Sequence, residues 1–214
     1  MGIDIVDPRI EDYLRDLLGG EHEIASEMEE AADGFPIVGR IVGVTLEVLA
    51  RAVRARRVLE LGSGFGYSAY WFARAVGQGG EVHMTDADAE KQARAADYLG
   101  RAGLADRIRS HVGEALDVFE ELDGQFDVIF NDIDKTGYPE AWRRARDRIR
   151  PGGLYLCDNV LWSGRVVEGI DDEGQEDVTA AVVEHNRAVA ADQGYRSTII
   201  PTRDGVMVAV RLTD

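Results

Sequence analysis

From Arg57 onward, short apolar runs alternate with segments of helical periodicity, and this alternation limits the possible folds more than any other feature. Strands separated by helices of about 10 to 15 residues form parallel sheets with helices on both faces. The runs that predict strands are residues 57–61, 81–85, 108–112, 126–130, 153–157, 195–200 and 206–212. The segments that predict helices are residues 67–76, 89–99, 115–122, 139–149 and 178–191.

The last two runs are joined by residues 202–205, Thr-Arg-Asp-Gly, which are typical of a hairpin turn. A hairpin adds an antiparallel edge to parallel strands, so we expect a mixed sheet of the α/β class. Residues 1–55 have helical character, and no linker separates them from the first strand. We therefore predict one domain over residues 1–214, with a helical cap (1–55) on a core (56–214).

The formal net charge of −16 disfavours nucleic-acid binding, because such a surface repels phosphate. Among 24 basic residues only Lys91 and Lys135 are lysine, so 22 are arginine. An acidic, lysine-poor surface suggests adaptation to high salt, where charges are screened within about 3 Å at 1 M. In that case the charge reflects the solvent, and tRNA is not excluded as a partner.

The sequence also indicates where the protein works. No run of about 18 apolar residues exists that could span a membrane, and the first residues lack the features of a secretory signal. The single cysteine, Cys157, rules out an internal disulfide and fits a reducing compartment. We expect a cytoplasmic protein in which Cys157 is a small residue of a buried strand.

Four predicted strands end in a residue that is suited to ligand binding. These residues are Gly62, Asp86, Asp132 and Asp158. In open α/β sheets, ligands bind outside the carboxyl ends of the strands. The four strand ends therefore predict a single shared active site.

A glycine-rich turn follows the first predicted strand, with glycines at positions 62, 64 and 66. Glycine lets the chain bend tightly and lets a ligand approach the backbone closely. A dinucleotide site would require glycine where Tyr67 stands, so a ligand without pyrophosphate is favoured. Asp86 is suited to accept hydrogen bonds from both hydroxyls of a ribose.

Two further strand ends predict a metal site. Asp132, Asp158 and Asn159 offer two carboxylates and an amide oxygen, which suit Mg2+ or another divalent cation such as Mn2+ or Ca2+. Lys135 would lie beside that cation, where its proton is easier to lose. A cation that stabilises a deprotonated oxygen, next to a lysine that accepts the proton, suits chemistry on a hydroxyl group.

These motifs resemble those of the cation-dependent O-methyltransferases, a group of class I S-adenosylmethionine-dependent methyltransferases that includes the catechol and caffeoyl-coenzyme A enzymes. The resemblance runs from about Val38 to Leu212 and is most specific in residues 60–68, 126–138 and 158–162. It implies a Rossmann-like seven-stranded sheet whose last strand is antiparallel. It also implies S-adenosylmethionine as methyl donor, a divalent cation, a small phenolic acceptor with vicinal oxygens, and a homodimer.

The resemblance gives each matching residue a role. On the cofactor side it implies Val38, Gly39, Glu60, Gly62, Ser63, Ser68, Asp86, Ala115, Asp132 and Asp134. At the metal it implies Asp132, Asp158 and Asn159, with Lys135 as the catalytic base. Trp162 and Ser163 match positions that contact the acceptor.

The chain departs from the family pattern in three places. The family commonly has Val-Asp-Ala-Asp-Lys where residues 131–135 read Asn-Asp-Ile-Asp-Lys, and the bulkier Ile133 is expected to reshape the wall beside the metal. The catechol enzyme carries an acid just after its final Asp-Gly, whereas Met207 stands here, which argues against a simple catechol as acceptor. Residues 1–35 show no match.

Three other functions remain open. A tRNA hydroxyuridine O-methyltransferase uses the same metal ligands. A nicotinamide-dependent reductase is disfavoured by Tyr67 in the glycine-rich turn. A non-catalytic cofactor-binding protein is disfavoured by the metal ligands together with Lys135. The other lysine, Lys91, is expected to be solvated on a polar helix.

Overall fold

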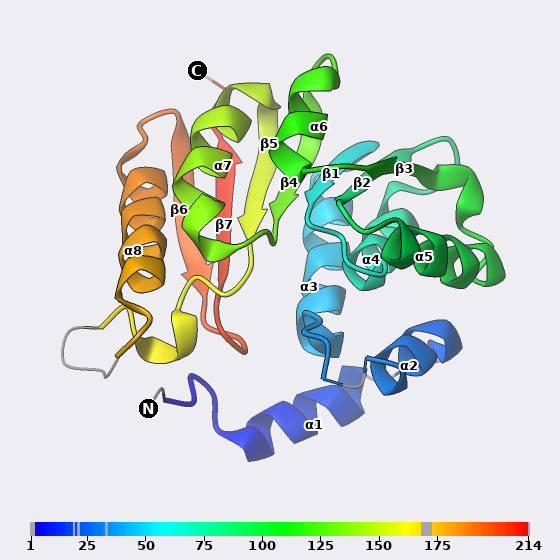
Figure 1. Cartoon of the computed structure of the whole chain (residues 1–214), viewed down its shortest axis with the longest axis horizontal. Coiled ribbons are helices and arrows are strands. Elements are labelled where there is room, and N and C mark those ends of the chain that lie inside the picture. Colours follow the sequence, from blue (N-terminus) through cyan, green and yellow to red (C-terminus); the bar gives the residue numbers. More distant parts are fainter. Residues whose placement is uncertain (1–2, 19, 21, 33, 168–172, 214) are drawn as a thin grey trace.

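The computed structural model describes residues 3–18, 20, 22–32, 34–167 and 173–213, which fold around one seven-stranded sheet (Figure 1). The strand order is β3-β2-β1-β4-β5-β7-β6. The strands are β1 (Arg57–Leu61), β2 (Glu81–Asp86), β3 (Ile108–Val112), β4 (Phe126–Asn131), β5 (Ile149–Cys157), β6 (Tyr195–Ile200) and β7 (Val206–Arg211). β1 to β5 pair in parallel, and β7 is antiparallel to both β5 and β6. The predicted mixed α/β sheet is confirmed.

The predicted hairpin forms one edge of the sheet, and the sequence left the order of its two strands open. β7 lies between β5 and β6, and β6 forms the edge. Burial explains the order. Val206, Met207 and Ala209 of β7 are buried, whereas Tyr195 is the only buried residue of β6. The more apolar strand of the hairpin takes the inner position.

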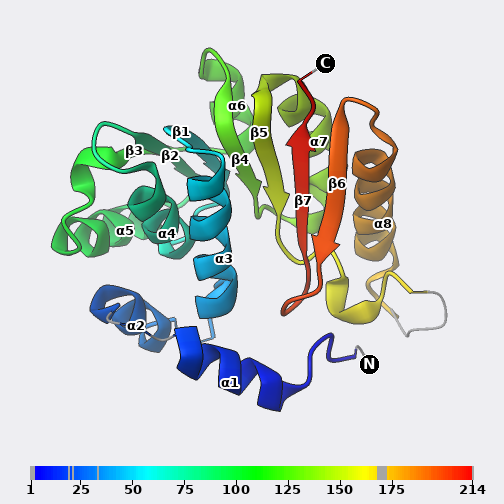
Figure 2. The same ribbon diagram turned by 180° about the vertical axis from the view of Figure 1, so that it is seen from behind.

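Helices cover both faces of the sheet (Figures 1 and 2). One face carries α3 (Gly39–Ala52), α4 (Tyr67–Val76) and α5 (Ala89–Arg101). The other carries α6 (Ala115–Glu121), α7 (Tyr138–Ala145) and α8 (Glu176–Ala191). Side chains of β5 alternate between the two cores, with Leu154 and Leu156 in one and Tyr155 and Cys157 in the other. Burial raises the pKa of the Cys157 thiol, as expected for a packing residue.

The predicted helix over residues 139–149 ends too late. α7 stops at Ala145, a short 3₁₀ helix spans Arg146–Arg148, and β5 already begins at Ile149. Ile149 is fully buried and pairs with Phe126 of β4. Burial of this side chain against the sheet extends β5 toward its amino end, past a break in the pairing between Phe126 and Val128.

The amino-terminal segment is helical, as predicted, and includes α1 (Pro8–Leu18), α2 (Glu23–Glu30) and α3. α1 and α2 lie across the end of the sheet where the parallel strands finish (Figures 1 and 2, blue). The buried guanidinium of Arg40 pairs with Glu29 at 2.7 Å and bonds Ser26 at 2.9 Å, and the Tyr67 hydroxyl donates to the same Glu29 carboxylate. This network joins α2 to α3 and α4. Within the described residues, no helix is long and apolar enough to cross a membrane.

Candidate active site

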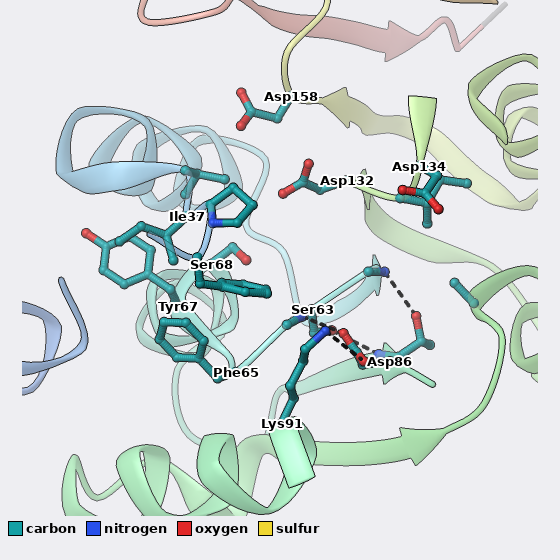
Figure 3. Close-up of a pocket in the computed structure, with 18 of the residues that line it drawn as sticks. Ile37, Ser63, Phe65, Tyr67, Ser68, Asp86, Lys91, Asp132, Asp134 and Asp158 are labelled. Atoms are coloured by element: carbon teal, nitrogen blue, oxygen red, sulfur yellow. Dashed lines mark hydrogen bonds and ion pairs between the residues drawn. The ribbon is translucent and has the colours of Figure 1, made fainter. Parts of the chain in front are cut away.

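A cavity of about 610 Å³ opens at the carboxyl ends of the parallel strands. It brings together most of the site residues that the sequence predicts, namely Val38, Gly62, Ser63, Ser68, Asp86, Ala115, Asp132, Asp134, Lys135, Asp158 and Asn159. Figure 3 shows the Asp132 and Asp158 carboxylates pointing toward the space that Ser63, Ser68 and Asp86 border from the opposite side. The cofactor side and the metal side of the prediction therefore share one cavity.

The glycine-rich turn is held by hydrogen bonds to β2. The Ser63 amide donates to the Thr85 carbonyl at 2.8 Å, and the Ser63 hydroxyl accepts from the Thr85 amide at 2.9 Å. Gly62 has a φ of +82°, and a Cβ added there would lie 2.6 Å from the carbonyl oxygen of Asp132. Only glycine lets β1 and the end of β4 approach this closely.

Asp86 ends β2 at the base of the cavity. Its carboxylate accepts from the Gly64 amide at 3.0 Å and from the Asp88 amide at 2.8 Å. Each carboxylate oxygen has lone pairs beyond these bonds, so Asp86 can accept further hydrogen bonds from hydroxyls in the cavity.

Glu60 is fully buried behind the turn and does not itself line the cavity. Neither of its carboxylate oxygens has a hydrogen-bond partner among the described residues. Burial raises the pKa of Glu60 to about 7, an effect that the nearby hydroxyls of Ser68 and Ser63 offset only in part. A buried carboxylate of this kind is suited to a cationic partner.

Asp132 and Asp158 place two carboxylates close together at the ends of β4 and β5. Burial is the main cause that raises both pKa values, and the Asp158 charge raises the pKa of Asp132 further. The Oδ1 atom of Asp158 has no hydrogen-bond partner among the described residues. A cation between the two groups would relieve both the repulsion and the cost of burial.

Lys135 lies among the predicted metal ligands. Its Nζ donates to Asn159 Oδ1 at 2.7 Å and lies 3.7 Å from Asp132 Oδ1. Its side chain is 19% exposed and faces the rings of Tyr138 and Trp162. The oxygens predicted to bind a cation thus already attract a positive charge.

The donor set fits a hard cation and does not fit zinc. In the part of the chain that the structure describes, no group of three or more His, Cys, Asp or Glu side chains could hold a metal ion. The predicted ligands Asp132, Asp158 and Asn159 would offer two carboxylates and an amide oxygen, an all-oxygen set that leaves coordination positions for water or substrate, as Mg2+ requires.

The loop after β5 is strained. Five described non-glycine residues have a positive φ, and four lie in this loop or in the facing β6–β7 turn: Asn159, Trp162, Ser163 and Arg203. Tyr138 donates to the Asp158 carbonyl at 2.9 Å, and Asn186 of α8 donates to the Val160 carbonyl at 2.7 Å. Backbone strain of this kind persists where the surroundings hold it, and it clusters at functional sites.

Four predicted residues do not line this cavity. Glu60 lies behind it, and Gly39 lines a neighbouring cavity. Trp162 packs at the edge of the core shared by α7 and α8. The Ser163 amide donates to Asp204, and its carbonyl accepts from the Ile3 amide at 2.8 Å.

The sequence reasoning missed several cavity residues, among them Phe35, Tyr67, Lys91 and Arg203. Lys91, expected to be solvated, has a side chain 36% exposed, and its Nζ lies 4.0 Å from Asp86 Oδ1 and over the Phe35 ring. The scarcity of lysine could have pointed to Lys91, because both lysines of this arginine-rich chain line the cavity.

The model of a protein family described as O-methyltransferase matches residues 22–212 of the chain. A catechol O-methyltransferase of Niastella koreensis is 32% identical over 214 residues, covering 94% of this chain and 96% of the relative. The caffeoyl-CoA O-methyltransferase 5 of Nicotiana tabacum is 32% identical over 180 residues, covering 80% and 75%.

Solved structures agree with these sequence relatives. The O-methyltransferase from Bacillus cereus in complex with SAH superposes with a TM-score of 0.84 at 28% identity, covering 95% of this chain and 97% of that one. The O-methyltransferase TomG from Streptomyces achromogenes, involved in tomaymycin synthesis and solved with SAM, gives a TM-score of 0.86 at 30% identity, with 96% of each chain covered.

The contact between Gly62 and Asp132 can be tested with a matched pair of variants. Gly103 has a similar φ of +70°, and a Cβ added there meets nothing within 4 Å. Gly103→Ala should therefore cost only the left-handed backbone penalty, about 1–2 kcal/mol of unfolding free energy. Gly62→Ala should lose about 1–3 kcal/mol more, because the new methyl group overlaps the Asp132 carbonyl. Equal losses in denaturant melts of the two variants would contradict this account.

Proposed function

Because this chain belongs to the O-methyltransferase family, we propose that it methylates a hydroxyl of a small phenolic acceptor with vicinal oxygens, with the help of a divalent cation. It is an S-adenosylmethionine-dependent methyltransferase. Family membership sets aside the reductase and the non-catalytic protein. The observation that carries the proposal is the meeting of Asp132, Asp158, Asn159 and Lys135 beside the glycine-rich turn. The net charge of −16 favours a small acceptor over tRNA.

The cavity residues fit S-adenosylmethionine. Gly62 and Gly64 leave room for a ligand against the backbone, Asp86 can accept from the ribose hydroxyls, and Ala115 borders the cavity where the adenine would lie. Ser68 lines the end assigned to the methionine carboxylate. Glu60, with two unpartnered buried oxygens, suits a cationic group such as the methionine amine. Val38, Gly39, Ser63, Asp132 and Asp134 complete the proposed cofactor set.

Asp132, Asp158 and Asn159 would hold the divalent cation. A cation bound there favours the deprotonated form of an acceptor hydroxyl, whose pKa near 10 otherwise keeps it protonated at neutral pH. An acceptor with two adjacent oxygens would be fixed in one orientation by such a site. Effective placement of two bound reactants can lower the barrier by about 7–11 kcal/mol.

Lys135 is the proposed general base. Its Nζ already lies within hydrogen-bonding distance of Asn159, so it can reach a hydroxyl bound at the same place. Arginine could supply the same charge, but it does not give up its proton in proteins. Trp162 and Ser163 do not line the cavity, so they remain proposed acceptor contacts only. Their strained loop would have to move to bring them to the cavity.

Asp158→Ala tests the metal site. The variant should lose metal-dependent methyl transfer down to the rate of the wild-type protein in EDTA, because one of three ligands is gone. Its affinity for S-adenosylhomocysteine, measured by calorimetry, should change little, since Asp158 lies on the metal side of the cavity. Undiminished turnover of the wild-type protein in EDTA would sink the proposed metal requirement.

Two substitutions distinguish a proton-accepting role of Lys135 from a purely electrostatic one. Lys135→Met removes both and should slow methyl transfer about 10²–10⁴-fold. Lys135→Arg keeps the charge, so it should be nearly as slow if Lys135 accepts a proton. Single-turnover rates across pH provide the measurement. Recovery of the wild-type rate by the arginine variant would assign Lys135 an electrostatic role only.

Homodimerisation, a cytoplasmic location and adaptation to salt are further proposals. α1 has no buried residue, and it exposes three large apolar side chains at helical spacing. Ile10, Tyr13 and Leu17 are 52%, 63% and 63% exposed. A second copy that covers this apolar face would explain it. Leu17→Glu should then halve the mass found by sedimentation, whereas Glu11→Gln should not.

Adaptation to salt is tested by thermal melts of the wild-type protein. It should melt at higher temperature in molar salt than in dilute buffer; an unchanged melting temperature argues against salt adaptation.

A further inference from the structure

Three cationic side chains line the main cavity: Lys91, Lys135 and Arg203. Lys91 lies 4.0 Å from carboxylate oxygens of Asp86 and Asp88, and Lys135 lies 3.7 Å from Asp132. For Arg203, no carboxylate oxygen of the described residues comes within 4.0 Å. Arg203 is therefore the cavity cation whose charge has no direct ion-pair partner in the described structure.

Arg203 stands in the turn between β6 and β7 with a φ of +47°. A glycine would adopt this backbone conformation without strain, whereas arginine does so at a cost. The side chain is exposed, and its Nη1 donates to the Ile37 carbonyl at 2.8 Å. The guanidinium also lies against Gly39, where a Cβ would collide with it. Strained residues of this kind persist where the surrounding structure holds them, and they cluster at functional sites.

The guanidinium retains unused hydrogen-bonding capacity. Of its five N–H groups, the described residues engage one, through Ile37. Arg203 lines the same cavity as Asp158 and Asn159, the residues on the metal side. Arg203 and Ile37 also border a second cavity of about 270 Å³, whose other charged lining residues are Arg15, Arg40, Glu11 and Glu29. An acceptor that extends from the metal side past Arg203 would find space there.

We propose that Arg203 binds an anionic group of the methyl acceptor and so selects acidic phenols over neutral ones. The inference rests on the proposed function and names its substrate class: a vicinal diol that carries a carboxylate or a phosphate. Guanidinium binds both anions through paired, charge-assisted hydrogen bonds. A protein of net charge −16 repels anions at a distance, so an anionic acceptor requires a local cation at the site.

Three acceptors with the same dihydroxyphenyl ring separate the possibilities: caffeate, its neutral methyl ester, and caffeoyl-CoA. Their binding to the wild-type protein with Mg2+ and S-adenosylhomocysteine is measured by calorimetry, and their methylation is measured separately. We expect at least one anionic acceptor to bind about tenfold or more tightly than the ester, the range of a hydrogen bond to a charged group. Preference for caffeate identifies a carboxylate as the recognised anion, and preference for caffeoyl-CoA alone identifies the phosphates of the carrier.

Arg203→Met should reduce the ratio of anion to ester affinity to about one, and Arg203→Lys should retain part of it. Arg203→Gly should lose the preference while melting at the same or a higher temperature, because it relieves the positive φ. Arg196→Met is the control, since Arg196 is an exposed arginine of the same hairpin that borders neither cavity. It should keep the wild-type ratio.

Two results would overturn the inference. One is a wild-type protein that binds the ester as tightly as both anions. The other is an Arg203→Met variant that weakens all acceptors and S-adenosylhomocysteine by one factor, as expected if Arg203 only holds the Ile37 segment in place. Failure of the proposed function looks different: none of the three acceptors would be methylated, although anion-selective binding that depends on Arg203 would persist.

Discussion

The close approach of β1 and β4 at their carboxyl ends is the constraint on which the site depends. The Asp132 amide donates to the Leu61 carbonyl at 2.9 Å, and the Asp132 carbonyl lies where a side chain at position 62 would be. The glycine-rich turn and Asp132, the first of the proposed metal ligands, are thus neighbours through their backbones. A methyl donor bound at the turn and an acceptor held at the proposed metal ligands would meet only if these two strand ends stay together, so the rigid sheet would set the geometry of the transfer.

A buried polar chain supports the metal side from beneath. Tyr155 and His185 share a hydrogen bond of 3.0 Å, and His185 pairs with Asn186 at 3.1 Å. Asn186 then holds the Val160 carbonyl, directly after Asn159. Burial lowers the pKa of His185 to about 4, which keeps the imidazole neutral at physiological pH. This chain connects α8 to the strained loop and helps to explain why that loop holds its conformation.

The sequence predicted the fold well because the signals are local. Apolar runs bounded by glycine and aspartate locate most strands to within one residue, and the strand ends locate the shared cavity. Packing decides the remaining details. The early start of β5 depends on the burial of Ile149 against Phe126, and the inner position of β7 depends on which hairpin strand is more apolar.

The predicted site was incomplete for a related reason. Motif matches find residues that follow strand ends, whereas Phe35 and Arg203 reach the cavity from the amino-terminal cap and from the far hairpin. Neither residue is itself part of a matched motif, although Val38 and the Asp-Gly pair at 204–205 lie close by. Trp162 and Ser163 show the opposite case, because a position in a motif does not determine which way a strained loop turns its side chains.

The scarcity of lysine has a practical consequence. Apart from the amino terminus, every primary amine of this protein belongs to Lys91 or Lys135, and both border the cavity. Acylating reagents, which scatter over the surface of an ordinary protein, would here report on ligand occupancy. Because the other basic residues are arginines, the side-chain amines of this protein are concentrated at the candidate active site.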